Sequence, residues 1–114
     1  MDQVDRESIF PGIARRILFL DEKVMVSLAE VSPGAKQAAQ RHSFVQMAYI
    51  LQGKAEYVAS GKTQILEPGA FYYLSSNEEH EITNVGNENC VSLDIFIPPP
   101  EQVLRARQAR KDQP

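Results

Sequence analysis

The chain has 114 residues, enough for one domain built around a single core. Its 15 acidic and 12 basic residues give a net charge of -3, so it lacks the basic character typical of nucleic-acid-binding proteins. No apolar run is long enough for a membrane helix, the first eight residues do not resemble a secretory signal, and we expect a cytoplasmic protein. The single cysteine, Cys90, excludes an internal disulfide and a thiolate zinc site, and we expect it to be buried on a strand.

Short strand-like segments separated by turn signals run through most of the chain. The first eight residues are expected to be frayed, and a turn follows at residues 10–12. We expect strands at residues 15–20, 24–31, 45–51, 54–59, 62–66, 70–74, 80–85 and 90–97. The polar segment 35–41 is a loop or an edge strand. This pattern favours a closed barrel or jelly roll over alternating strands and helices.

Three consecutive prolines, Pro98 to Pro100, end the sheet because proline cannot donate to a strand ladder. A short docked helix is expected over residues 101–111, with residues 112–114 loose. We therefore divide the chain into an N-terminal arm (1–12), a β-barrel (13–98) and a C-terminal helix and tail (99–114).

Side-chain alternation predicts which faces of two strands are buried. In residues 45–51, one face carries the apolar set Val45, Met47, Tyr49 and Leu51. This face is too apolar to remain in water, and we expect a homodimer that covers it. In residues 90–97, Asp94 alternates with apolar residues, which we expect to fill the core between the sheets while Asp94 lies on the opposite side.

His80 begins the predicted strand 80–85, His42 comes shortly before the predicted strand 45–51, and two glutamines accompany His42. Gln40 and Gln46 lie two residues before and four residues after His42, so all three share one side of an extended chain. Neutral imidazoles such as those of His42 and His80 bind divalent transition metals, and a glutamine carbonyl oxygen can complete the coordination. These residues point to a metal site, with structural, hydrogen-bonded histidines as the alternative.

The spacing of these residues resembles the two motifs of the cupin family of small β-barrels. The first motif, Gly-x5-His-x-His-x3-Glu-x6-Gly, is matched in register by Gly34, Gln40, His42, Gln46 and Gly53. The second, Gly-x5-Pro-x-Gly-x2-His-x3-Asn, is matched in register by Gly69, Ser75, Asn77, His80 and Asn84. The resemblance covers residues 24–98. It implies an all-β, cupin-type double-stranded β-helix, which is a jelly-roll barrel, here followed by a short C-terminal helix.

The resemblance also implies a divalent metal ion, with Zn, Ni, Mn and Fe all compatible, bound by Gln40, His42, Gln46 and His80. Gln40 and Gln46 stand where the family has a histidine and a glutamate, so the set carries no negative charge. Such a site should hold a metal less tightly than three histidines and a glutamate. It should favour Lewis-acid chemistry over redox chemistry.

Within the cupins, the chain is most similar to the single-domain proteins of pectin and alginate breakdown that help convert unsaturated uronates to linear keto sugars. Those proteins also carry glutamine at the carboxylate position and end in Asp-x-Phe-x-Pro, here Asp94 to Pro98. The resemblance implies that Asp94 transfers protons as a general acid or base. The family's substrate-binding arginine position is Pro100 here, so a substrate carboxylate must be bound elsewhere, with Arg41 as one candidate.

Aromatic residues concentrate in the middle of the chain and could stack on a sugar ring. Most should belong to the core. The expected lining of the substrate pocket is Tyr57, Tyr73 and Phe96.

Three functions remain open at this point. The first is a metal-assisted lyase or isomerase acting on a small carbohydrate-derived or oxo-acid substrate. The second is a non-enzymatic barrel with a degenerate metal site that binds or senses a small ligand. The third is a dioxygenase, which the missing histidine and glutamate disfavour. The expected partners are a small molecule and a second copy of the chain, without nucleic acid or membrane.

Overall fold

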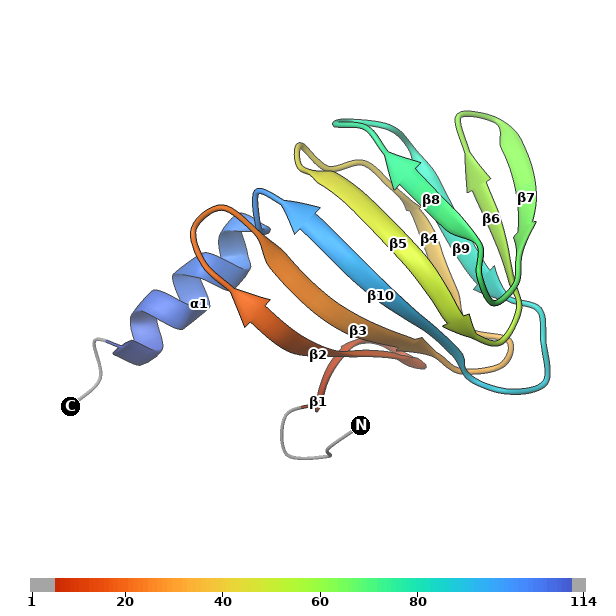
Figure 1. Cartoon of the computed structure of the whole chain (residues 1–114), viewed down its shortest axis with the longest axis horizontal. Coiled ribbons are helices and arrows are strands. Elements are labelled where there is room, and N and C mark those ends of the chain that lie inside the picture. The colour runs from red at the N-terminus through yellow and green to blue at the C-terminus, as the bar shows by residue number, and fades with distance from the viewer. Residues whose placement is uncertain (1–5, 112–114) are drawn as a thin grey trace.

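The computed structural model describes residues 6–111, so the expectations for residues 1–5 of the arm and 112–114 of the tail lie outside it. Two antiparallel sheets face each other in a jelly-roll sandwich, and one helix, α1 (Glu101–Lys111), follows the last strand (Figure 1). This is the fold class that the sequence predicts. No helix in residues 6–111 is both long and apolar enough to cross a membrane.

The larger sheet has the strand order β1-β2-β3-β10-β5-β8, and the smaller sheet has the order β4-β9-β6-β7. The strands of the larger sheet are β1 (Arg6–Phe10), β2 (Ile13–Leu20), β3 (Met25–Val31), β10 (Cys90–Ile97), β5 (Val45–Gln52) and β8 (Phe71–Leu74). Those of the smaller sheet are β4 (Lys36–Gln40), β9 (His80–Asn84), β6 (Ala55–Ala59) and β7 (Lys62–Leu66). From β3 onward each connection crosses between the sheets except the one from β6 to β7, and both histidines lie on the interior side of the sandwich.

Strand β1 differs from the sequence-based expectation. Residues 6–8 are not frayed but pair with β2, where Glu7 lies opposite Arg15 and Ser8 opposite Ala14. The polar segment before His42 forms β4, so of the two alternatives, loop or edge, it is an edge strand. Both strands are short, polar edge strands, and the apolar alternation that reveals the other strands is missing from them.

The inner faces of β5, β6 and β8 form the main core. Ala48 and Ile50 are buried on β5, whereas Tyr49 and Leu51 on the same strand are 44% and 48% exposed on its outer face. The predicted alternation of β5 is therefore confirmed. Cys90 is buried in the same cluster, as expected.

The prediction of which face of β10 points into the core is wrong. Strand β10 lies in the middle of the larger sheet between β3 and β5, and its inward residues are Ser92, Asp94 and Phe96, which are 9%, 7% and 8% exposed. The apolar residues that alternate with them face the outside of the sheet instead of the core between the sheets. Asp94 is thus an interior carboxyl group, because the interior of the sandwich contains a polar cavity at this level.

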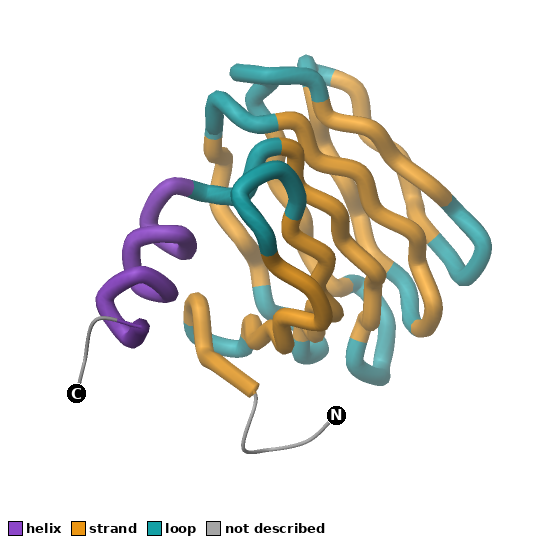
Figure 2. The backbone as a smooth tube through the Cα atoms, turned by 60° about the vertical axis from the view of Figure 1, so that its left-hand side comes forward, coloured by secondary structure: helices purple, strands orange, loops and turns teal. Residues whose placement is uncertain are grey.

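Helix α1 lies beside one end of the sandwich, next to the turn between β2 and β3 (Figure 2). Its Val103 is buried against Met25 and Phe96, and the Arg107 guanidinium donates a hydrogen bond to the Leu20 carbonyl. The helix therefore packs behind Phe96, one of the residues that line the cavity.

Asn84 shows why an amide suits the last position of the second motif. Its Nδ2 donates to the carbonyls of Val31 and Glu88, both at 2.8 Å, and its Oδ1 accepts from the Gly86 N–H at 2.8 Å. This buried side chain joins the end of β9 in the smaller sheet to β3 in the larger sheet. It therefore fixes how the two sheets meet below the cavity.

Candidate functional site

A cavity of about 190 Å³ lies between the two sheets. Its polar lining comes from both sheets, from the loop before β5 and from the start of α1, and consists of Arg15, Ser27, Gln37, Gln40, His42, Gln46, Tyr72, His80, Ser92, Asp94 and Gln102. The four metal ligands expected from the sequence and the expected proton-transfer residue therefore share one small space.

The two histidines meet edge to face, with ring centroids 4.8 Å apart. The Nδ1 atom of each ring lies 3.2 Å from a backbone carbonyl oxygen, that of Phe44 for His42 and that of Glu78 for His80. A carbonyl oxygen can only accept a hydrogen bond, so the Nδ1 of His80 donates its proton. His42 has an acceptor oxygen at 3.2 Å from each ring nitrogen, so its neutral ring can donate from Nδ1 to Phe44 or from Nε2 to Gln46. When both neutral rings carry their proton on Nδ1, both Nε2 atoms hold a lone pair, which is the tautomer that binds a metal through Nε2.

Gln46 brings a third donor atom to the first histidine. Its Oε1 lies 3.2 Å from His42 Nε2, and its Nε2 donates to the Tyr72 hydroxyl at 3.4 Å. An amide oxygen and an unprotonated imidazole nitrogen are both acceptors, so they repel at this distance unless a proton or a metal ion lies between them. This pair can therefore share either the Nε2 proton of His42 or a metal ion.

Gln40 is a weaker candidate for a metal ligand. It lies opposite His80 where β4 pairs with β9, but its Oε1 already accepts a hydrogen bond from Gln37 Nε2 at 2.9 Å. No group of three or more histidine, cysteine or acidic residues within the described part of the chain could hold a metal ion. A metal here would rest on two imidazoles and on neutral amide oxygens.

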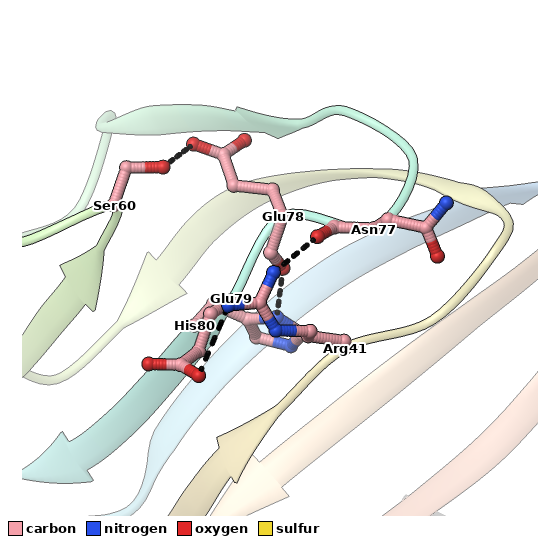
Figure 3. Close-up of polar contacts among 6 residues, drawn as sticks. All are labelled: Arg41, Ser60, Asn77, Glu78, Glu79 and His80. Carbon is pink, nitrogen blue, oxygen red and sulfur yellow. Dashed lines mark hydrogen bonds and ion pairs between the residues drawn. The ribbon is translucent and has the colours of Figure 1, made fainter.

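The loop between β8 and β9 positions His80 (Figure 3). Glu78 receives hydrogen bonds from the Ser60 hydroxyl at 2.7 Å and from the Ser75 N–H at 3.1 Å, while its backbone carbonyl accepts from the His80 ring. Burial lowers the pKa of His80; the bond to the Glu78 carbonyl opposes this change, and the neighbouring His42 reinforces it. The result favours a neutral His80 with a fixed orientation.

Arg41 belongs to the same loop contacts and not to the cavity. It donates to the Asn77 carbonyl at 3.2 Å and forms an ion pair with Glu79 at 3.5 Å (Figure 3). Its side chain is largely exposed, and it is absent from the cavity lining. A ligand inside the cavity would not reach it.

Asp94 is the acidic residue of the cavity lining. Burial raises the pKa of its carboxyl group to about 6, although a hydrogen bond from Ser92 and the positive charge of Arg15 act in the opposite direction. A group with this pKa is present in both protonation states near neutrality, which suits a general acid or base. Its Oδ1 is buried and has no hydrogen-bond partner among residues 6–111.

The three aromatic residues expected in the substrate pocket lie in different places. Phe96 lines the cavity, where it contacts Phe44 edge to face at 5.4 Å, and Phe44 in turn stacks on His42. Tyr57 is buried in the core against Tyr72, and Tyr73 points outward and is 57% exposed. Tyr57 and Tyr73 line a separate shallow depression on the surface.

Arg15, Ser27 and Tyr72 line the cavity but are not singled out by the sequence. Arg15 and Arg16 are adjacent, and only the pairing of β2 with β3 decides which one faces inward. Tyr72 lies between two other aromatic residues, so composition gives no reason to choose it over Tyr73. Alternation along β8 relative to the buried Leu74 is the one signal that could have identified it.

Comparison with known proteins agrees with this fold. Residues 27–96 match the Cupin domain family. The L-ectoine synthase of Bordetella parapertussis is 28% identical over 91 residues, which span 76% of this chain and 69% of that protein; the enzyme of Vibrio campbellii is 25% identical over 87 residues, 74% of this chain and 68% of that protein.

Two solved structures show the same fold. KdgF from Halomonas sp. superimposes with a TM-score of 0.81 at 23% identity, covering 87% of this chain and 90% of that one. An RmlC-like cupin from Shewanella frigidimarina gives a TM-score of 0.80 at 21% identity, covering 89% of each chain. With the family match spanning more than half of its length, this chain belongs to the cupin family.

Proposed function

We propose that this cupin is a metal-dependent lyase or isomerase that acts on a small carbohydrate-derived or oxo-acid substrate. One observation carries the proposal: an interior carboxyl group with a pKa of about 6 shares a small cavity with two histidines, and the Nδ1 atom of each histidine lies 3.2 Å from a backbone carbonyl oxygen. The sequence identity of 25% and 28% to two L-ectoine synthases supports the proposal of an enzyme of small-molecule metabolism. The cavity volume of about 190 Å³ favours a substrate smaller than the ligands of typical 300–1,000 Å³ sites.

In this proposal His42, His80 and Gln46 hold a divalent metal ion, with Gln40 as a further ligand. A bound divalent metal would supply a Lewis acid that polarises a carbonyl oxygen of the substrate. Asp94, as the carboxylate, accepts a proton from the carbon next to that carbonyl and returns it to another atom of the substrate. Phe44 and Phe96 supply an apolar wall that limits the access of water to the reacting carbon.

Metal content and turnover test the proposal. Protein purified without a histidine tag should contain stoichiometric divalent metal, which His42→Ala and His80→Ala should remove. Asp94→Asn should keep the metal but lose at least roughly 100-fold in turnover of an unsaturated uronate or another small oxo acid, a loss typical of a missing general base. Glu67→Gln, which changes an exposed acid between β7 and β8, serves as the control and should retain full activity. Metal-free wild-type protein of unchanged stability would refute the metal site, and full turnover by Asp94→Asn would refute the proton-transfer role.

A second function follows from the neutral donor set. Because no three histidine, cysteine or acidic side chains in residues 6–111 converge on one point, the same cavity could bind a small ligand without catalysis. In that case the chain would act as a ligand-binding or sensing module. Ligand binding that survives complete removal of metal, together with no turnover, would favour this function over the enzyme.

A further inference from the structure

Among the described residues, Arg15 contributes a positively charged side chain to the cavity lining. It reaches the cavity from β2, and its side chain is only 17% exposed. The remaining lining contains no lysine and no other arginine. A guanidinium buried to this degree needs an anionic partner, since an unpaired buried charge is costly.

Glu7 provides that partner in this structure. Its Oε1 accepts a hydrogen bond from Arg15 Nε at 2.6 Å, and the two residues lie opposite each other where β1 pairs with β2. Glu7 itself is 51% exposed on an edge strand that pairs with β2 alone. The acid that is hydrogen-bonded to Arg15 therefore stands on an edge strand of the larger sheet, and Ile9 and Phe10 of the same strand form part of the cavity lining.

We propose that Arg15 binds the carboxylate of a small hydroxy- or oxo-acid ligand, and that Glu7 occupies this carboxylate position when the ligand is absent. The guanidinium has five N–H donors in a planar fork, of which the bond to Glu7 uses one, so it can grip a carboxylate with two parallel bonds. The proposal deepens the proposed function by naming the group that selects an acid as the substrate.

Two polar atoms on the neighbouring strands of the same sheet complete the match to such a ligand. Ser27 Oγ and Asp94 Oδ1 are buried and have no hydrogen-bond partner among the described residues, and their residues face each other on β3 and β10. A hydroxyl or oxo group of the ligand would satisfy them while its carboxylate reaches Arg15. A ligand with an anionic end and a hydroxylated end fits the cavity better than a neutral or purely apolar one.

Binding of D-galacturonate tests this assignment. D-Galactose serves as its neutral counterpart, and pyruvate and acetate serve as smaller acids. We would titrate EDTA-treated, metal-free protein and follow amide chemical shifts and heats of binding. Arg15→Gln should weaken binding of the acids at least tenfold, Arg15→Lys should weaken it less, and Glu7→Gln should strengthen it several-fold. D-Galactose should bind weakly and equally to all variants.

Arg16→Gln is the matched control, because Arg16 is the next residue on β2, pairs with Leu28 and is not part of the cavity lining. Three outcomes would overturn the inference. Arg15→Gln could bind the acids as well as the wild type, or Arg16→Gln could weaken acid binding as much as Arg15→Gln does. The third is that neither the wild type nor Glu7→Gln binds any of the acids detectably. The assay needs neither metal nor turnover. If acid binding depends on Arg15 but the protein never binds metal, the proposed function is refuted and this inference stands. If turnover depends on metal but is unaffected by Arg15→Gln, this inference is refuted and the proposed function stands.

Discussion

Asp94 and Ser27 lie directly opposite each other on β10 and β3, and each buries an oxygen atom that lacks a hydrogen-bond partner among the described residues. Leaving such an atom unpaired costs about 1–3 kcal/mol, so a protein selected for stability alone would replace it. The pair lies within the cavity that His42 and His80 also line. The free-energy cost of these two unpaired oxygen atoms is therefore best explained by a role in binding a polar ligand.

The raised pKa of Asp94 predicts an unusual dependence of stability on pH. Burial favours the protonated carboxyl group in the folded state and raises its pKa to about 6, whereas in the unfolded state the pKa has its ordinary value of 3.8. The folded state therefore binds more protons between these values, so this group lowers the free energy of unfolding as pH rises from about 4 to about 6. Asp94→Asn should remove this slope and stabilise the protein by roughly 2–3 kcal/mol at pH 7.5, which urea unfolding at several pH values would measure.

Asp21 offers a control of opposite sign. Backbone hydrogen bonds from Lys23 and Val24 lower the pKa of this exposed carboxyl group, so it stabilises the fold at neutral pH and loses that effect as pH falls. Asp21→Asn should therefore destabilise the protein at neutral pH but not in acid. If Asp94→Asn shows the same pH dependence as Asp21→Asn, the burial of Asp94 does not govern its titration.

Gln46→Glu should strengthen metal binding. The substitution is nearly isosteric and places a negative charge beside His42 Nε2, where the wild type has a neutral amide oxygen at 3.2 Å. A gain of about 1.4 kcal/mol or more corresponds to at least a tenfold lower dissociation constant for Zn²⁺ or Mn²⁺, measured by competitive titration. Gln64→Glu, on the exposed part of β7, adds the same charge outside the cavity and should leave metal affinity unchanged. Equal effects of the two substitutions would show that general charge, and not coordination, is responsible.

Particular residues show what the sequence could predict and what it could not. The register of the two cupin-like motifs predicts that Gln40, His42, Gln46 and His80 share one site, and in the structure all four line one cavity. The inward face of β10 could not be predicted, because Ser92, Asp94 and Phe96 look like an outer face unless the interior is known to be polar.

Arg15 and β1 were missed for a related reason. Their positions depend on pairing between strands and not on local alternation, since β1 has no apolar period and either Arg15 or Arg16 could face inward until β2 pairs with β3. Tyr73 was placed in the pocket because aromatic residues suit sugar binding. Its neighbour Tyr72 lines the cavity instead, since alternation along β8 buries Tyr72 and exposes Tyr73.

Asn84→Asp should be among the most destabilising conservative substitutions. A carboxylate cannot donate to the Val31 and Glu88 carbonyls, so the change removes two buried hydrogen bonds and opposes two acceptors with a negative charge. We expect a loss of about 3 kcal/mol or more at neutral pH, measured by thermal or urea unfolding. Asn87→Asp, an exposed position in the turn that follows β9, should cost less than about 0.5 kcal/mol. Comparable losses at both positions would mean that Asn84 does not hold the sheets together.

The outer face of the larger sheet predicts a homodimer. Tyr49 lies opposite Phe71 and Met47 opposite Tyr73, and the aromatic members of these pairs are between 44% and 57% exposed. Large contiguous apolar patches of this kind mark interfaces, and a two-fold axis would place the same residues of a second copy against them.

Replacing both Phe71 and Tyr73 with lysine tests this arrangement. The double variant would bring like charges together across the two-fold axis, which costs several kcal/mol, so it should sediment as a monomer at concentrations where the wild type is a dimer. Ile65→Lys, an exposed apolar residue on β7 of the smaller sheet, changes the charge in the same direction and should leave the dimer intact. Both residues face away from the cavity, so the monomeric variant should keep its metal and ligand affinities. A wild type that remains monomeric across the whole concentration range in analytical ultracentrifugation would contradict the dimer, and dissociation by Ile65→Lys would assign the interface to the other sheet.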